Sequence, residues 1–486
     1  MELQNSAQIV QSLYLAYIGR AADPDGLAYW QGQLESGEVS TEAIEQAIIG
    51  SDEASGYLAE LDSGEYVRSL YNQYFERDPG DDEVAYWAGR VDNGELGRAN
   101  LANSMIDAAS EFDREALSAK LAVANYYSQN VAQEDYDAQQ ALALDNLHSN
   151  EALYAALQQL DSDHEAMTLE QVGESVEGNP LYSAVVGTGP QTLMIATQQH
   201  GDEPLGTEAA LYLLDYLAGD SAEAQALREE VTVVVMPRVN PDGFARWQEQ
   251  VAGGEDILDP RRNSNDIDLN RTYDPSVPND PDLAPESAAV RQVVEQYQPD
   301  LFVDMHHQNN YRSTDGSLDT LSALWATNEG VDASLMETGQ RAIVSIDQAL
   351  EEFEHANLTL YPGSDNPAIG RNGLGLDGTA TLLVEQRGLQ EMDQLAQGVE
   401  LDYSALAGAL TLESYLAMKG IAESMASGEF EQIDPSLALE IPERSDSIDF
   451  AELYGDDQYV PTEDEPTMVA EEVPTLGIQH DDALIA

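Results

Sequence analysis

The stretch TLMIATQQHGDEP, residues 192–204, joins an apolar run to a polar loop. The run predicts a buried strand that ends just before His200. In α/β proteins, functional sites assemble where such strands end. His200 and Glu203 lie three residues apart across a turn that Gly201 permits, so both side chains can face one cation. Taken alone, such a pair is more often part of a surface loop than of a metal site.

Similar apolar runs alternate with helical segments along much of the chain. VTVVVMP (231–237), LFVDMH (301–306) and TATLLVEQ (379–386) have the character of strands, whereas TEAALYLLDYLA (207–218) has that of a helix. This alternation predicts an α/β domain with a mixed or mostly parallel sheet. We place this domain at residues 165–427, after a helical connector at 116–164. An acidic tail that is largely disordered is expected at 428–486.

A repeat occupies residues 1–115. The segment LYLAYIGRAADPDGLAYW from Leu13 recurs as LYNQYFERDPGDDEVAYW from Leu70, 57 positions later. In each copy, an Asp/Pro/Gly turn separates two segments whose apolar and aromatic residues have helical spacing. We therefore predict a small all-α domain in which the two copies bury their aromatic residues against each other. The Asp-rich turns are also candidate calcium sites, although such turns are usually only turns.

The composition is strongly acidic. The 486 residues include 91 Asp and Glu against 20 Lys and Arg, which gives a formal net charge of −71. Such a surface disfavours nucleic acid and anionic membranes and indicates adaptation to high salt. Neither a secretory signal nor a membrane span is visible. We expect an extracellular protein exported without a signal peptide, or alternatively a cytoplasmic protein of a salt-accumulating halophile.

A metal site would have to use histidine and carboxylate ligands, because the chain has no cysteine. LFVDMHH places His306 and His307 at the end of a second apolar strand. Zinc commonly takes two histidines and one carboxylate and leaves one position for water. His200 and Glu203 with one of these two histidines would form such a set. Glu385 lies within the apolar run TATLLVEQ, where burial would raise its proton affinity and suit it to act as a general base.

Cations cluster in the stretch RRNSNDIDLNR, residues 261–271. Arg261, Arg262 and Arg271 occur there with Asn270 in a chain that is poor in basic residues. Arginine and asparagine together suit a carboxylate that accepts several hydrogen bonds, so the cluster predicts an anion-binding site. The alternative is simple charge balance against the neighbouring aspartates.

Taken in order, these motifs resemble the zinc carboxypeptidase family, the carboxypeptidase-A-like metallopeptidases. The resemblance covers about residues 165–425 and is carried by GESVEGNP (173–180), HGDE (200–203), VNPDG (239–243), RRN and DLNR (261–271), PE (285–286), DMH (304–306) and VEQRG (384–388). It implies an α/β fold with a carboxypeptidase-like mixed eight-stranded sheet flanked by helices, after the small all-α repeat domain. That repeat is similar to a helical domain of unknown function found in exported bacterial proteins.

The resemblance also implies roles for individual residues. One zinc ion per chain would be bound by His200, Glu203 and His306, with His307 as the alternative to His306, and Glu385 would activate a water. Arg261, or Arg262 in its place, would polarise the scissile carbonyl. Asn270 and Arg271 would bind the terminal carboxylate of the substrate, and Tyr361 would close over it, although its spacing from Glu385 differs from the usual one by two residues.

The predicted function is that of a zinc metallocarboxypeptidase acting on peptides with a free C-terminal carboxylate. Two alternatives remain open. Asp202 and Pro204 are similar to the amidase branches of the superfamily, which act on acylated amino acids or cell-wall peptides. The chain could also be a surface-binding protein whose peptidase fold is inactive.

Overall fold

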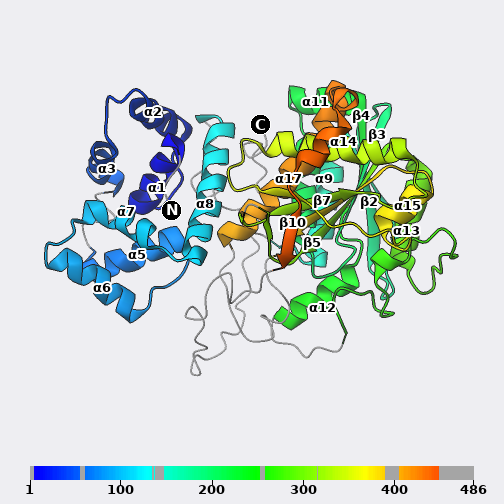
Figure 1. The fold of residues 1–486 in the computed structure, drawn as a ribbon, viewed down its shortest axis with the longest axis horizontal. Coiled ribbons are helices and arrows are strands. Elements are labelled where there is room, and N and C mark those ends of the chain that lie inside the picture. The colour runs from blue at the N-terminus through cyan, green and yellow to red at the C-terminus, as the bar shows by residue number, and fades with distance from the viewer. Residues whose placement is uncertain are drawn as a thin grey trace. The chain divides into compact units, whose positions relative to one another are not determined.

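The computed structural model describes residues 5–54, 61–133, 136, 147–251, 258–314, 316–388 and 404–447. The described chain divides into two compact units (Figure 1). Among the described residues, those from 5 to 136 and 404–409 belong to the first unit, and 147–388 with 410–447 belong to the second. The first is helical, and the second is built on a β-sheet.

The first unit repeats three helices. Equivalent helices begin 57 residues apart, at Ser6 and Ser63, at Pro24 and Asp81, and at Thr41 and Arg98. The prediction of an all-α region is confirmed. The helices described in this unit are α1 (Ser6–Ile18), α2 (Pro24–Glu35), α3 (Thr41–Ile49), α5 (Ser63–Phe75), α6 (Asp81–Asp92), α7 (Arg98–Ala108) and α8 (Glu111–Asn130).

The repeat buries only some of its aromatic residues. Tyr17 and its equivalent Tyr74 are fully buried in the core of this unit. Tyr29 and its equivalent Tyr86 are each 58% exposed, so the expectation that they would be buried is wrong. Each is followed by a tryptophan that packs on the core, and successive residues of a helix point about 100° apart. One helix face therefore cannot bury both rings.

One of the Asp-rich turns has a structural use. Asp23 is the N-cap of α2, and its carboxylate accepts a hydrogen bond from the Gly26 amide at 3.0 Å. An N-cap aspartate satisfies one of the free amides at the start of a helix. Calcium binding at these turns stays a prediction.

The second unit contains an eight-stranded mixed sheet, as predicted. The strand order is β1-β2-β4-β3-β5-β9-β7-β8. The central strands β4, β3, β5 and β9 are parallel to one another, and antiparallel pairing occurs toward both edges. The strands are β1 (Met167–Glu174), β2 (Pro180–Val186), β3 (Gln191–Thr197), β4 (Val231–Met236), β5 (Leu301–Gln308), β7 (Leu321–Trp325), β8 (Leu358–Leu360) and β9 (Thr381–Arg387).

Helices cover both faces of this sheet. Met194 and Ala196 of β3 share a core cluster with Val290 of helix α13. Thr197 has the opposite parity and contacts Thr207 of helix α10, so α10 lies on the other face. The α-helices described from residue 147 onward are α9 (Asn150–Asp163), α10 (Leu205–Ala218), α11 (Ala222–Glu230), α12 (Pro241–Val251), α13 (Pro285–Tyr297), α14 (Ala333–Leu350), α15 (Gly370–Leu376) and α17 (Ser404–Ser427).

The second unit continues beyond Ser427, where we expected the domain to end. The 3-10 helices η4 (Phe430–Gln432) and η5 (Pro435–Glu440) and strand β10 (Arg444–Ser447) follow α17. Phe430, Ala438 and Ile441 are buried, so their apolar side chains hold this segment against the unit. Strand β10 forms a small second sheet with β6 (Tyr311–Ser313). The predicted tail from residue 448 onward lies outside the described residues.

The predicted connector 116–164 is divided between the two units. Helix α8 belongs to the first unit and helix α9 to the second. Residues 137–146 between them lie outside the described chain.

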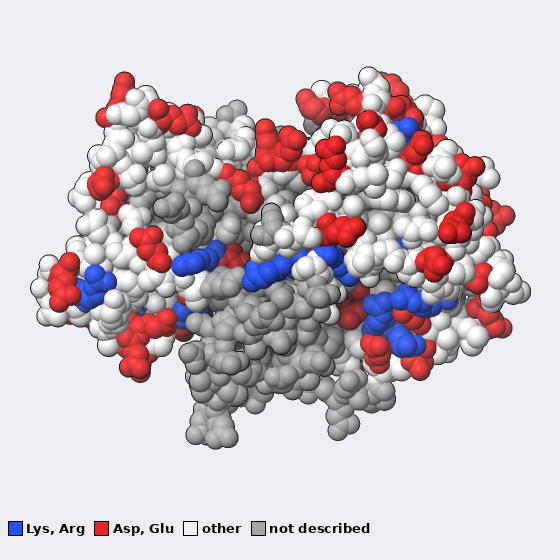
Figure 2. Space-filling view, viewed as in Figure 1, with Lys and Arg blue, Asp and Glu red and all other residues white. Residues whose placement is uncertain are grey.

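Figure 2 shows acidic side chains spread over the visible face of both units, with a smaller number of basic side chains among them. Among the described helices, none combines the length and apolar character needed to cross a bilayer.

Candidate metal centre and active site

Strand β3 delivers His200 through a tight turn. The strand ends at Thr197, and Gln198 takes a left-handed conformation with φ of 56°. Its side-chain amide donates to the Gly201 carbonyl at 2.8 Å. A Cβ on Gly201 would lie 2.1 Å from the carbonyl carbon of Gly243, so only glycine fits there. The HGDE and VNPDG motifs are therefore in backbone contact.

Strand β5 delivers the second histidine to the same edge of the sheet. It runs parallel to β3, with Thr197 opposite Met305, so His306 reaches the point where the His200 loop begins. His307 points to the other face and accepts a hydrogen bond from the Leu205 amide at 3.2 Å. Burial lowers the pKa of His307 to about 4, which keeps its ring neutral. The structure thus brings His306, not His307, to the candidate metal site.

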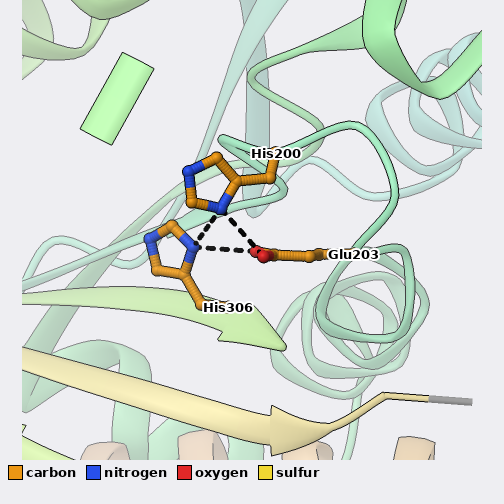
Figure 3. A group of neighbouring side chains, drawn as sticks. All are labelled: His200, Glu203 and His306. Carbon is orange, nitrogen blue, oxygen red and sulfur yellow. Dashed lines mark hydrogen bonds and ion pairs between the residues drawn. The ribbon is translucent and has the colours of Figure 1, made fainter. Parts of the chain in front are cut away.

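His200, Glu203 and His306 converge on one point (Figure 3). The Nδ1 atom of His200 lies 2.8 Å from Glu203 Oε1, and the Nδ1 atom of His306 lies 2.8 Å from Glu203 Oε2. The two Nδ1 atoms are 3.0 Å apart. Within the described part of the chain, this is the one group of three such residues whose donor atoms approach closely enough to hold a metal ion. The set has the two nitrogens and one carboxylate that zinc prefers.

The outer nitrogens of both imidazoles meet carboxylates. His200 Nε2 lies 3.1 Å from Asp268 Oδ1, and His306 Nε2 lies 3.0 Å from Asp304 Oδ2. A metal-binding histidine usually donates its other N–H group to a carboxylate, which fixes the tautomer and orients the ring. Both inner nitrogens are thereby left as ligands. Our sequence interpretation gave neither aspartate a role, although both occur in the DLNR and DMH motifs.

Charge within the cluster is balanced by its own members. Burial alone would raise the pKa of Glu203, but His200 and His306 outweigh it and hold the pKa well below its ordinary value. Burial alone would lower the pKa of His306, but Asp304 and Glu203 raise it well above the ordinary range. Protons on the imidazoles thus supply the positive charge that a divalent cation would supply on binding.

Glu385 lies beside this cluster on the neighbouring strand. In the parallel pairing of β5 and β9, Glu385 is the register partner of His306, so both side chains leave the sheet on the same face. The residue is 9% exposed. Burial raises the pKa of Glu385 to about 7. A carboxylate with this pKa can both accept and release a proton near neutral pH.

Arg261 and Arg262, the two candidates for polarising the scissile carbonyl, point to different parts of the structure. Arg261 reaches the metal cluster, with Nη1 3.5 Å from Glu203 Oε1 and Nε 3.3 Å from Asp268 Oδ2. Arg262 instead pairs with two aspartates outside the cluster, Asp259 and Asp266. Arg261 is therefore the arginine that the structure brings to the site.

Asn270 and Arg271 are presented in different ways. Asn270 is buried; its Oδ1 accepts from the Gly370 amide at 2.7 Å, and its Nδ2 lies 3.1 Å from His306 Nε2. Arg271 is exposed, and its Nη1 donates to the Asn270 carbonyl at 2.7 Å. No carboxylate of the described residues pairs with Arg271. Its guanidinium is available to an anion, whereas the side-chain oxygen of Asn270 is already engaged by the Gly370 amide.

Tyr361 follows strand β8 and lies near Glu385. Its amide donates to the Ala323 carbonyl at 3.0 Å. Burial raises the pKa of the Tyr361 hydroxyl, and the charge of Glu385 raises it further. The structure thus places this tyrosine in the electrostatic neighbourhood of the candidate base.

Two further motifs build the scaffold around the site. Asp242 accepts hydrogen bonds from Ser175, from the Glu177 amide and from Asn179. Glu286 is fully buried and accepts from the Val176 amide at 3.0 Å. The GESVEGNP, VNPDG and PE motifs therefore form one network of hydrogen bonds, whose role is structural.

A family model described as zinc carboxypeptidase matches residues 153–315. The matched span contains His200, Glu203 and His306 in the arrangement described above. This part of the second unit is therefore similar to the zinc carboxypeptidases. The match ends before Tyr361 and Glu385, so the placement of those two residues rests on the geometry of the second unit alone.

A second family model, a domain of unknown function designated DUF4214, matches residues 3–57 and again 45–116. Both matches fall on the helical repeat, which agrees with the resemblance noted from its sequence.

Curated relatives match part of the chain. Mouse carboxypeptidase M is 31% identical over 137 residues, which cover 26% of this chain and 30% of that protein. Carboxypeptidase 2 of Trichophyton rubrum is 26% identical over 214 residues, which cover 40% of this chain and 36% of that protein. The chain thus spans about a third of the length of these two relatives.

Solved structures are also similar. A metallo-carboxypeptidase from Burkholderia cenocepacia matches with a TM-score of 0.44 and 20% identity over 57% of this chain and 70% of that one. A metallo-carboxypeptidase from Pseudomonas aeruginosa matches with a TM-score of 0.42 and 21% identity over 58% of this chain and 70% of that one.

Proposed function

We propose that the protein is a zinc-dependent metallocarboxypeptidase that removes residues from the C-terminal end of peptides. One observation carries this proposal. Two buried imidazoles direct their Nδ1 atoms to a buried carboxylate, while Asp268 and Asp304 hold their Nε2 atoms. Bound there, zinc would supply Lewis acidity to a water and to the scissile carbonyl.

The residues around the centre divide the remaining work. Glu385 takes a proton from the attacking water and passes it to the leaving amine, a role to which its pKa of about 7 suits it. Arg261 stabilises the oxyanion that forms on the carbonyl, because its guanidinium already reaches Glu203. Arg271 binds the terminal carboxylate of the substrate. Tyr361 closes over the substrate at the side of Glu385.

A panel of blocked dipeptides tests this function. Hydrolysis should require a free C-terminal carboxylate, should stop on chelation and should return when zinc is added. We expect one zinc ion per chain after extensive dialysis, whereas an inactive, surface-binding relative need not retain metal. Failure to cleave any such dipeptide in the zinc-loaded state would rule out the proposal. Because the net charge is −71, the assay should cover several salt concentrations.

One observation favours a second candidate, an amidase that acts on acylated amino acids or cell-wall peptides. The Gly370 amide donates to the side-chain oxygen of Asn270 and so fixes its carboxamide, which leaves the exposed Arg271 as the adaptable member of the predicted carboxylate-binding pair. A site with a weaker hold on the terminal carboxylate would accept substrates that lack one. Comparison of each dipeptide with its C-terminal amide separates the two activities, since only an amidase would cleave both at similar rates.

A further inference from the structure

The C-terminal segment of the second unit lies between two strands that end near the site. The Leu360 amide donates to the Pro442 carbonyl at 2.8 Å, and Leu360 also forms an isolated bridge with Glu443. Strand β10 begins at the next residue and pairs with β6, where Arg444 is the register partner of Ser313. Arg444 is thus fixed between the residue before Tyr361 and the strand that begins at Tyr311.

The guanidinium of Arg444 is sandwiched between two tyrosine rings. Its Cζ atom lies 3.7 Å from the ring centroid of Tyr311 and 4.0 Å from that of Tyr361. Nη1 donates to the side-chain oxygen of Gln308, at the end of strand β5. The buried Nε has no hydrogen-bond partner, and no carboxylate among the described side chains pairs with this arginine. In so acidic a chain, a cation whose main contacts are two aromatic faces is positioned by those rings and positions them in return.

The positive charge of Arg444 lowers the pKa of both Tyr361 and Glu385. It opposes the rise in the pKa of Tyr361 that burial and Glu385 cause, and it also lowers the pKa of Glu385. The segment that follows Tyr361, residues 362–366, is exposed. The Arg444 stack is therefore a side-chain contact that holds the Tyr361 ring where this exposed segment begins.

We propose that Arg444 is a positioning residue of the active site, which holds the Tyr361 ring against its own guanidinium so that strand β10 completes the substrate-binding region. The proposal rests on the function proposed above, because Tyr361 is taken to close over the substrate. A ring that is already placed loses less conformational freedom when substrate binds. Removal of the guanidinium should therefore raise KM more than it lowers kcat.

The variants Arg444→Met and Arg444→Lys test this role. Methionine fills much of the space without a charge, whereas lysine keeps a cation near the rings. We expect kcat/KM to fall about 3- to 30-fold in Arg444→Met, the range set by one cation–π contact, and to recover in part in Arg444→Lys. Zinc content should be unchanged in both. Arg341→Met is the matched control, because Arg341 contacts the same C-terminal segment through the Ile433 carbonyl and touches neither tyrosine.

A double-mutant cycle with Tyr361→Ala separates positioning from general packing. If Arg444 acts through Tyr361, Arg444→Met should cost little when the Tyr361 ring is already absent. The same fold-loss in both backgrounds would overturn the proposal, as would wild-type kinetics in Arg444→Met. A loss equal to that of Arg341→Met would also overturn it.

A second readout does not depend on catalysis. A 3-fluorotyrosine at position 361 reports its surroundings by fluorine NMR in the full chain, whether or not any peptide is hydrolysed. We expect its resonance to shift and narrow in Arg444→Met and to stay unchanged in Arg341→Met. An unchanged resonance in Arg444→Met would refute the positioning role even if hydrolysis were normal in the wild type. Conversely, if the wild type hydrolyses no peptide, the proposed function is wrong, but the fluorine resonance still tests whether Arg444 positions Tyr361.

Discussion

Replacement of Glu385 by glutamine tests whether this buried carboxylate takes the proton from the attacking water. Glutamine has nearly the same volume but cannot take a proton from water. Glu385 is 9% exposed, so bulk water is a poor substitute for it. Loss of a general base typically costs about 10²- to 10⁴-fold in rate, and we expect kcat to fall by that amount. Zinc should be retained, because the convergent ligand atoms belong to His200, Glu203 and His306.

The pH dependence of the hydrolysis rate provides a second quantitative test of the role of Glu385. Burial raises the pKa of Glu385 to about 7, and only its unprotonated form can act as the base. Below its pKa, the rate should fall about tenfold for each pH unit, and above it the rate should level off. A bound dication favours the charged carboxylate, so the inflection of the zinc-loaded enzyme should lie at or below about pH 7. The acid limb should be absent in Glu385→Gln.

Steady-state hydrolysis of a blocked dipeptide with a free C-terminal carboxylate, measured from about pH 5 to 9, supplies both numbers. Metal content per chain is measured on the same samples. Glu352→Gln, at an exposed position, is the control for loss of one carboxylate. Turnover within tenfold of the wild type, with zinc retained and the acid limb intact, would show that another group is the base.

Three further changes have outcomes that the structure predicts. Asp304→Asn replaces the charged acceptor of His306 Nε2–H with a neutral, weaker one and should weaken zinc binding about 10- to 100-fold in chelator competition; unchanged affinity would contradict the orienting role. Gly201→Ala places a Cβ 2.1 Å from the Gly243 carbonyl carbon and should cost about 1–3 kcal/mol in the free energy of unfolding, measured with urea. Burial raises the pKa of Glu413 to about 7 from 4.5, so the folded state binds the proton more tightly than the unfolded state. The stabilisation by protonated Glu413 is complete below pH 4.5 and is lost as pH rises through about 7. Between these two pH values, the free energy of unfolding of the wild type should fall by about 3 kcal/mol, whereas that of Glu413→Gln should not show this fall. Equal pH dependence in the two proteins would exclude Glu413 as the cause.

The sheet and the metal ligands could be predicted because both depend on local sequence. A run of apolar residues determines where a strand lies, and parallel strands place the residues after their carboxyl ends at one edge. His200 and His306 follow such runs, so their proximity needed no knowledge of distant contacts. The choice between His306 and His307 was different in kind. It depended on which face of β5 the loop after β3 approaches: Glu203 contacts His306, whereas the amide of Leu205, the first residue of α10, contacts His307 on the other face.

The residues that support the ligands could not be chosen in the same way. Asp268 and Asp304 are two of 91 acidic residues, and acidity in this chain carries little information about any one of them. What distinguishes Asp304 is full burial within β5, where a carboxylate needs a partner such as His306 Nε2–H. Burial of a single side chain is a property of the packed sheet and not of the local pattern. Asn270 shows the converse, because its motif predicts contact with substrate while packing engages its carboxamide with Gly370.

Arg444 shows where the composition itself misleads. An acidic stretch of low hydrophobicity predicts disorder, because it cannot bury enough apolar surface to offset the loss of chain entropy. Residues 430–447 nevertheless fold, because Phe430, Ala438 and Ile441 are buried against the core of the second unit. The informative signal was the charge that breaks the pattern. Where nearly every titratable residue is acidic, an isolated arginine is a candidate for a specific contact. For Arg444 that contact is with the faces of Tyr311 and Tyr361.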